Sequence, residues 1–460
     1  MKKRLLSIVV VAVLALSLFV ACGSDAPVGN EDNQATNEAD DEIDNDEADD
    51  EAPAQGNGGS DENTLVVWCW DPAFNINAML EAEAIFQQIN PDFRLEIVET
   101  PWATMETALV TAASSGNLDA LPDIMLVQDT TFHKWVQIFP GIFYDLTDSD
   151  IAFHEFAPAK LSMLSLDGRH YGVPFDNATA VTALREDVLA EAGLTIDDFT
   201  NITWDEFIEL GLIVLEETGM PLIPDRAERT DVFTVMLNST DTRLFDTDGN
   251  PVIDSAPAIR AIVEQYVELV ETGVLLQVND WDQFVGAFTT GTTAGVVQGN
   301  WIMASIQTAE DQFGDWRITN TPRVATVPSS TNYSFQGGAS WAISGASENT
   351  QLAIDFLSAT FGASMELYDN ILPTGAIGTW LPAGDSDAYA VPHDFFGGQY
   401  VFQDVMSFSA QIIENLDPNG VFFFEARNAV GVAIVNILAG ADIDEELRIA
   451  QETVEFIMGQ

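Results

Sequence analysis

Tryptophans and short polar side chains recur where the sequence predicts a strand to end or the chain to cross between folded parts. An indole offers a flat apolar face, whereas carboxylates and amides offer planar hydrogen-bonding groups. Together these residue types suit a ligand that has an apolar CH face and a rim of hydroxyl groups, such as a sugar ring. The candidate ligand-binding residues are Trp70, Asp71, Trp102, Gln128, Asp129, Asp176, Asn177, Asn300, Trp301, Trp341, Phe423 or Phe424, and Arg427.

Each candidate taken singly has a structural alternative. A tryptophan is as often part of a core as part of a binding site, and Asp or Asn often caps a helix or begins a turn. Arg427 can bridge a cleft or pair with a neighbouring carboxylate. We therefore rest the prediction on the whole set of candidates. Three other tryptophans are assigned to packing: Trp135, Trp204 and Trp316.

The first candidates follow predicted strands of an α/β unit. The β-branched and aromatic runs at 64–70, 93–100 and 121–129 predict strands, and the segments 78–89 and 102–113 between them predict helices. This alternation is typical of a parallel sheet covered by helices on both faces. Ligands of such sheets bind beyond the carboxyl ends of the strands, so the candidates from Trp70 to Asp129 are expected along one rim.

Composition narrows the functional classes. The formal net charge of −57 argues against nucleic acid and against an anionic membrane surface as partners, because both require clustered Lys and Arg. The two cysteines, Cys22 and Cys69, do not support a disulfide framework. A chain of 460 residues is long enough for at least two lobes. The acidic excess also fits an alkaline or saline habitat.

The chain begins with features of an export signal. A basic triplet is followed by an apolar run to Val20 and by the small residue Ala21. The alternative, a transmembrane helix, needs roughly 20 apolar residues, more than this run has. The sequence from Leu18 to Gly23 resembles the lipobox of bacterial lipoproteins, which implies a signal peptide over 1–21 and a diacylglycerol on Cys22. An unmodified cysteine in a simple secretion signal is the alternative.

Residues 22–63 are predicted to form an acidic, disordered linker. The segment holds Asp, Glu, Asn, Ala and Gly with no basic residue and almost no apolar one, so it cannot bury enough surface to offset chain entropy. A calcium-binding tract is an alternative, but the segment lacks the alternating oxygen-ligand and glycine spacing of a preformed loop.

Five segments in order resemble one family. They are "LDGRHYGVPFDNATAVTALREDVLAEAGL" (166–194), "TWDEFIELG" (203–211), "FTTGTTAGVVQGNWIMASI" (288–306), "GGASWAISGASENTQLAIDFL" (337–357) and "FFFEARNAVGVAIVNILAG" (422–440). The chain from 64 to 460 is thereby similar to the extracellular solute-binding proteins of sugar ABC transporters, which include maltose-binding protein. It departs from the family pattern at Arg169, where a lysine is usual, and in "LREDVL".

The resemblance implies a two-lobed, periplasmic-binding-protein-like α/β fold of type II. Each lobe would be a mostly parallel sheet flanked by helices, and the chain would cross a hinge between lobes. The first lobe is expected to comprise 64–175 and 337–398, and the second 176–336 and 399–460. Closure of such a hinge would trap a ligand between the lobes.

The implied function is capture of a mono- or oligosaccharide outside the cell membrane and its delivery to the permease subunits of an ABC importer, by a lipid-anchored monomer that has no cofactor and no bound metal. One alternative is a binding protein for another solute, such as a polyamine, a peptide or a metal complex. The other is a surface glycoside hydrolase, which needs two carboxylates about 5 to 10 Å apart. No zinc-protease, nucleophile-elbow or P-loop motif occurs, so no enzyme is predicted.

Overall fold

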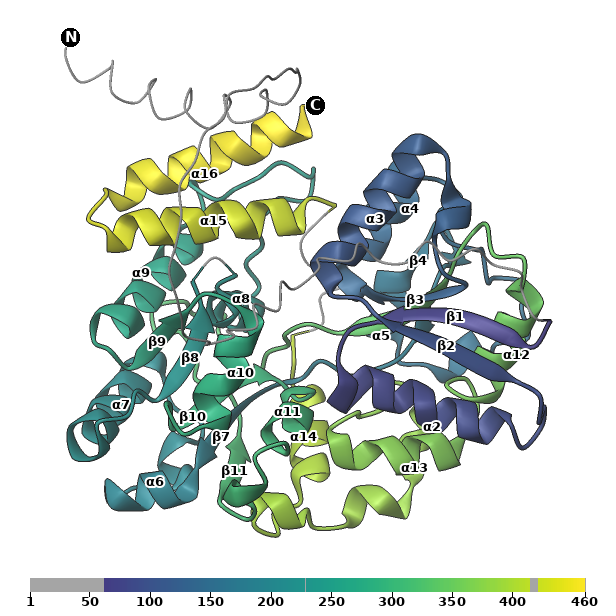
Figure 1. Cartoon of the computed structure of the whole chain (residues 1–460). Coiled ribbons are helices and arrows are strands. Elements are labelled where there is room, and N and C mark those ends of the chain that lie inside the picture. Colours follow the sequence, from purple (N-terminus) through teal and green to yellow (C-terminus); the bar gives the residue numbers. More distant parts are fainter. Residues whose placement is uncertain (1–61, 228, 414–420, 460) are drawn as a thin grey trace, which may run out of the picture. The chain divides into compact units, whose positions relative to one another are not determined.

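The computed structural model describes residues 62–227, 229–413 and 421–459. The predicted signal peptide, Cys22 and nearly all of the predicted linker lie outside the described residues. Two lobes, each with its own sheet and helices, make up the described part (Figure 1). None of the helices in these three ranges is both long and apolar enough to cross a bilayer.

The first lobe is built on a five-stranded sheet of order β2-β1-β3-β12-β6. β1 pairs in parallel with β2 and β3, whereas β12 runs antiparallel between β3 and β6. The strands are β1 (Thr64–Cys69), β2 (Arg94–Glu99), β3 (Ile124–Gln128), β6 (Val173–Pro174) and β12 (Ala339–Ile343), with a small hairpin of β4 (Ser165–Leu166) and β5 (Arg169–His170).

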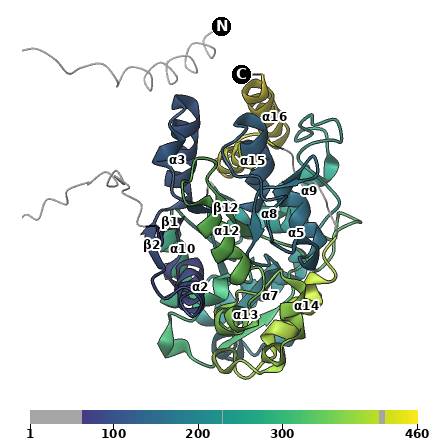
Figure 2. The same ribbon diagram turned by 90° about the vertical axis from the view of Figure 1, so that its right-hand side faces the viewer.

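Helices cover both faces of this sheet, as the alternation of side chains requires. Leu65, Val67 and Cys69 of β1 pack with α2, α12 and α13, whereas Trp68 and Trp70 pack on the side of α3 and α4. α2 and α13 lie side by side in both views (Figures 1 and 2). The helices of this lobe are α2 (Asn77–Phe86), α3 (Trp102–Ser115), α4 (Phe132–Ile138), α5 (Pro158–Leu164), α12 (Thr350–Ala359) and α13 (Met365–Ile371).

The second lobe departs from the expectation of mostly parallel sheets. Its three-stranded sheet, of order β10-β7-β11, is antiparallel throughout, and only the pair β8-β9 is parallel. The strands are β7 (Ala180–Arg185), β8 (Ile223–Arg226), β9 (Leu275–Val278), β10 (Gly295–Gly299) and β11 (Trp316–Thr319).

Two hydrophobic clusters fill the second lobe. One joins α7, α8, α9, α15 and α16, and the other joins α10, α11 and α14. Trp204 begins α7 behind the predicted capping box of Thr203 and Glu206. The helices are α6 (Glu186–Glu191), α7 (Trp204–Thr218), α8 (Asp231–Asn238), α9 (Pro257–Glu271), α10 (Trp281–Thr289), α11 (Ile302–Ile306), α14 (Val401–Ser409), α15 (Phe423–Leu438) and α16 (Ile443–Met458).

Three chain segments meet where the lobes join. The segment that leaves β6 pairs with the one that enters β12, because the Gln336 N–H donates to the Ala178 carbonyl at 2.8 Å. The Asn177 N–H donates to the Ile377 carbonyl at 2.9 Å, which adds a third segment. Beyond it, Tyr389 and Phe396 pack in one hydrophobic cluster with residues of β7, β10 and β11. The predicted change of lobe at residue 399 stays a prediction.

Candidate functional site

The rim of the first lobe begins directly after β1. Asp71 caps a short helical turn, η1 (Pro72–Ile76), because its carboxylate accepts the N–H groups of Ala73 and Phe74 at 2.9 and 3.1 Å. Burial raises the pKa of Asp71, and the two backbone hydrogen bonds oppose that shift. The half-buried Trp70 meets Trp102 edge to face, with ring centroids 5.8 Å apart. The predicted rim residues Trp70, Asp71 and Trp102 therefore lie together.

Trp301 occupies the join between the lobes. Its indole N–H donates to the Gln336 carbonyl at 2.9 Å, and its ring packs against the cores of both lobes. A Cβ added at Gly299 would lie 2.2 Å from the indole nitrogen, and one at Gly337 would lie 2.9 Å from it. The glycine before Asn300 in the Gly-Asn-Trp sequence is therefore required by the close approach of the ring.

A polar and aromatic group in the second lobe was missed by the sequence analysis. The Arg226 guanidinium lies 5.3 Å from the Trp281 ring, which lies 5.9 Å from that of Trp301. Arg226 also bonds to Asp231 at 2.5 Å, and the Gln336 amide donates to the same carboxylate at 2.9 Å. Arg226 ends β8 and Trp281 follows the parallel strand β9, so both lie at the carboxyl ends of parallel strands. That rule could have found Trp281, whereas Pro224 hides β8 in the sequence.

Asp129 and Asp176 make a different contact from the one predicted. Both are about 2% exposed, and Lys160 lies between them, with its ammonium 2.5 Å from Asp129 and 3.5 Å from Asp176. Ser340 and the Ala339 N–H complete their hydrogen bonding at 2.7 and 2.8 Å. These carboxylates are engaged in a buried ion cluster of the hinge, so we remove them from the proposed ligand set.

Most remaining polar candidates bind the backbone of the hinge. The Asn177 side chain accepts the Thr179 N–H and donates to Ser409, each at 2.9 Å, and the Asn300 amide donates to the Gly375 carbonyl at 2.7 Å. Gln128, half-buried at the end of β3, pairs with Ala339. Asn177 and Asn300 therefore have a structural role, because their side chains hold the segments that cross between the lobes.

Several aromatic candidates are buried. Trp341 is 0% exposed in β12 and packs against Phe175 and Phe361, so its ring has no free face for a ligand. The assignment of Trp135, Trp204 and Trp316 to packing is confirmed, since all are at most 1% exposed.

Arg427 lies near the join of the lobes, on α15. Its guanidinium lies 4.5 Å from the Phe424 ring and makes no ion pair with a described residue. Burial lowers its pKa to about 10. Phe423 and Phe424 are 4% and 8% exposed and belong to the second-lobe core. The Nε atom of Arg427 is buried and has no hydrogen-bond partner among the described residues.

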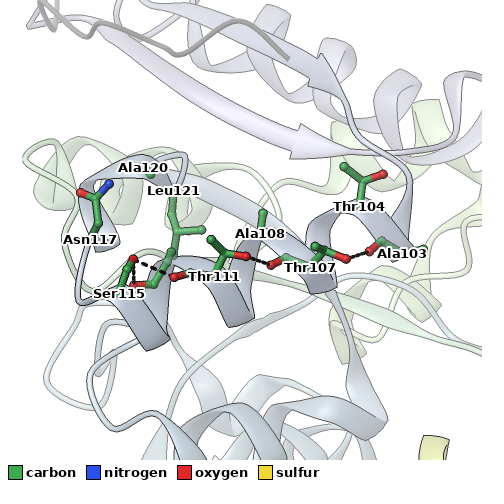
Figure 3. A pocket seen from close by; sticks show the side chains of 10 residues that line it. Ala103, Thr104, Thr107, Ala108, Thr111, Ser115, Asn117, Ala120 and Leu121 are labelled. Atoms are coloured by element: carbon green, nitrogen blue, oxygen red, sulfur yellow. Dashed lines mark hydrogen bonds between the residues drawn. The ribbon is translucent and has the colours of Figure 1, made fainter. Parts of the chain in front are cut away.

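An open groove lies elsewhere, along the outer face of α3. It has a volume of about 560 Å³ and is lined by the helix and the segment after it (Figure 3). The hydroxyls of Thr107, Thr111 and Ser115 bond to carbonyls of the helix itself, so the groove presents mostly methyl groups. None of the predicted ligand-binding residues lines it. Across residues 62–459, apart from the two gaps, no group of His, Cys, Asp and Glu side chains is arranged to hold a metal ion.

Residues 81–389 match the family described as bacterial extracellular solute-binding protein. The chain belongs to this family. The solute-binding protein is 34% identical over 389 residues to the lactose-binding protein of Rhizobium radiobacter, covering 84% of this chain and 91% of that one. It is 23% identical over 427 residues to the arabinooligosaccharide-binding protein of Halalkalibacterium halodurans, covering 86% of this chain and 90% of that one.

Solved structures agree on the fold. The GacH receptor of Streptomyces glaucescens, studied with acarbose, superposes with a TM-score of 0.72 at 16% identity, covering 86% of this chain and 98% of that one. A binding protein from B. animalis subsp. lactis in complex with β-1,6-galactobiose gives 0.72 at 19% identity, covering 85% and 96%. The predicted family and the two-lobed fold of the solute-binding protein are thus confirmed.

Proposed function

We propose that this solute-binding protein captures a short saccharide between its lobes and delivers it to the permease of an ABC importer, without changing it chemically. The proposal rests on two pairs of indole rings near the join of the lobes. Trp70 and Trp102 form the pair of the first lobe, and Trp281 and Trp301 form the pair of the second. The two pairs adjoin, because η1, which follows Trp70, contacts α11, which follows Trp301.

The polar groups beside the indoles complete a sugar-binding site. The half-buried indoles of Trp70, Trp281 and Trp301 cover the CH face of a pyranose, while Asp71 and Arg226 offer an acceptor and donors for its hydroxyl groups. Because these groups come from both lobes, a sugar that contacts all of them stabilises the closed form more than the open one. Sugar binding therefore shifts the population toward the closed form, and the permease can recognise that form.

Relatives guide the choice of sugar. The relative at 34% identity is named a lactose-binding protein and the more distant ones arabinooligosaccharide-binding proteins, so galactosides and arabinosides are the first ligands to test. A thermal-shift screen of lactose, galactobiose, arabinooligosaccharides and maltose should give a rise in Tm with at least one of them, because a ligand that binds only the folded state stabilises it. Spermidine and short peptides belong in the same screen as the competing class.

The outcome separates the candidate functions. A Tm rise with spermidine or a peptide and with none of the sugars would reject a saccharide as ligand. The glycosidase alternative is tested by incubating the protein with the bound oligosaccharide, which should be recovered unchanged. Release of shorter sugars would overturn the proposal that no chemistry occurs. The protein is expected to remain monomeric with and without ligand.

Anchoring at the outer face of the cell membrane is part of the proposal. The apolar run that ends at Cys22 and the acidic segment after it support a lipid tether with a spacer to the folded lobes. Cys22→Ser should move the protein from the membrane fraction to the medium. Cys69→Ala is the matched control, because Cys69 is fully buried in β1 and burial raises its pKa to about 12. Equal membrane association of both variants would reject the tether.

A further inference from the structure

Closing this protein brings two negatively charged bodies together. Both lobes carry many more carboxylates than cations, and Lys134 and Lys160 are the only lysines after Lys3. Like charges repel, so each step of closure has an electrostatic cost that neutral lobes would not have. The few cations that face the opposite lobe therefore carry unusual weight.

Lys134 is such a cation. It lies on α4 of the first lobe, and its ammonium group forms an ion pair with Glu425 in the first turn of α15 of the second lobe. The two side chains are 15% and 22% exposed, so water screens the pair less than it screens a surface pair. The start of α15 faces α3 and α4 in Figure 1.

A carboxylate of the first lobe lies among charges of the second. Glu106 on α3 is near enough to Arg229 and Arg427 of the second lobe for their positive charges to lower the pKa of its carboxyl group. Burial raises the pKa of Glu106, while the charges of Lys134, Arg229 and Arg427 lower it and that of Glu425 raises it. Each lobe thus presents both a cation and an anion to its partner lobe. We call this group the seam: Glu106, Lys134, Arg229, Glu425 and Arg427.

We propose that the Lys134–Glu425 ion pair is an electrostatic latch, which forms when the lobes close and sets how tightly and for how long the sugar is held. The inference rests on the proposed function, because it assumes lobes that close around a ligand. In this proposal the pair forms in the closed form alone, so the closing equilibrium and the apparent affinity change by the same factor when the pair is removed.

The test compares Lys134→Met with Arg169→Met. Arg169 also lies in the first lobe, but its ion-pair partner Asp145 lies in the same lobe, so this control removes an equal charge without touching the seam. We expect Lys134→Met to weaken sugar binding about 3- to 30-fold and to speed dissociation by a similar factor, the range set by a partly buried ion pair. Arg169→Met should bind within about 2-fold of the unaltered protein.

The charge reversal Lys134→Glu with Glu425→Lys provides the rescue. It restores an attractive pair with the same side chains exchanged, so affinity should return to within about 2-fold of the unaltered protein, whereas Lys134→Glu alone should bind more weakly than Lys134→Met. Affinity that is equal in Lys134→Met and Arg169→Met, or a double reversal that binds no better than Lys134→Glu, would overturn the latch.

A measurement on the ligand-free protein tests the latch separately from the proposed sugar-binding function. Small-angle scattering of the unliganded proteins should give a larger radius of gyration for Lys134→Met than for Arg169→Met, because loss of the latch favours the open form. If no sugar binds the unaltered protein, the proposed function fails while this comparison still tests the latch. Identical scattering of the two variants rejects the latch even where sugars bind.

Discussion

The ammonium group of Lys160 lies 2.5 Å from a carboxylate oxygen of Asp129, inside the hinge. The same nitrogen donates to the carbonyls of Asp176 and Ala339 at 2.7 and 3.0 Å. Asp176 follows β6 and Ala339 begins β12, so one lysine of α5 ties together the segment that leaves the first lobe and the segment that returns to it. The hinge therefore has a fixed polar centre.

Replacement of Lys160 should destabilise the folded protein. Lys160→Met leaves two buried carboxylates without their cation, and breaking such a pair typically costs about 3–5 kcal/mol. Urea unfolding should show a loss of that size in the free energy of unfolding. Arg448→Met removes an exposed cation of α16, and we expect it to change stability by less than about 1 kcal/mol. Losses of equal size in the two variants would show that Lys160 is not a structural centre.

The same cluster predicts a dependence of stability on pH. Burial, together with the charge of Asp129, raises the pKa of Asp176 to about 6, against the opposing charge of Lys160. An unfolded aspartate titrates near pH 4, so between about pH 4 and 6 the folded state binds the proton more tightly. The contribution is fully present below pH 4 and is lost as the pH rises through 6.

Asp176→Asn isolates this contribution. Between pH 4 and pH 7.5 the unaltered protein should lose roughly 2–3 kcal/mol of unfolding free energy relative to the variant. Urea unfolding at four pH values across that range measures it. A constant difference would mean that Asp176 titrates normally in the folded protein.

Gly299→Ala should damage the sugar site through Trp301. The added Cβ would lie 2.2 Å from the indole nitrogen and 2.4 Å from the Gln336 carbonyl that the indole binds, so ring or backbone must move, at a cost of about 1–3 kcal/mol. We expect at least roughly 10-fold weaker sugar binding by titration calorimetry, since the displaced ring loses its orientation. Gly286→Ala on α10 is the control, because its Cβ meets no atom within 4 Å. Unaltered affinity in Gly299→Ala would place Trp301 outside the site.

Trp281→Ala should weaken sugar binding with little effect on folding. The ring is half-buried and supports the Arg226 guanidinium, so its removal takes away a stacking face and the orientation of a donor at once. A loss of about 1–3 kcal/mol in binding free energy is expected. Trp281→Phe keeps a flat ring and should recover part of the loss. If both variants bind as the unaltered protein does, the ligand does not contact the Trp281 pair.

The sequence was sufficient for the first three strands of the first lobe. The runs at 64–70, 93–100 and 121–129 became β1, β2 and β3 with ends displaced by up to three residues, because a β-branched run bounded by turn residues has few other solutions. The rule of carboxyl ends then brought Trp70, Asp71 and Trp102 together. It missed Arg226 because β8 contains Pro224, which argues against a strand.

The wrong or incomplete parts of the predicted site depend on contacts between distant residues. Asp129 and Lys160 are separated by 31 residues, and no local pattern pairs them. Trp341 lies in β12, which has strand neighbours on both sides and helices on both faces of its sheet, so its neighbourhood follows from the topology and not from its own segment. Local sequence signals predict where elements begin and end. Which cation pairs with a carboxylate depends instead on the distant segments that the fold brings together.

The position of β12 has a consequence for the order in which the molecule is assembled. This strand lies between β3 and β6, yet it is made only after the whole segment from 176 to 336. A ribosome that has released residues 62–336 has supplied most of the second lobe, while the first still has a vacant place inside its sheet. Such late insertion is slow and leaves strand edges unpaired in the meantime, so a nascent chain would need protection until residue 343 emerges.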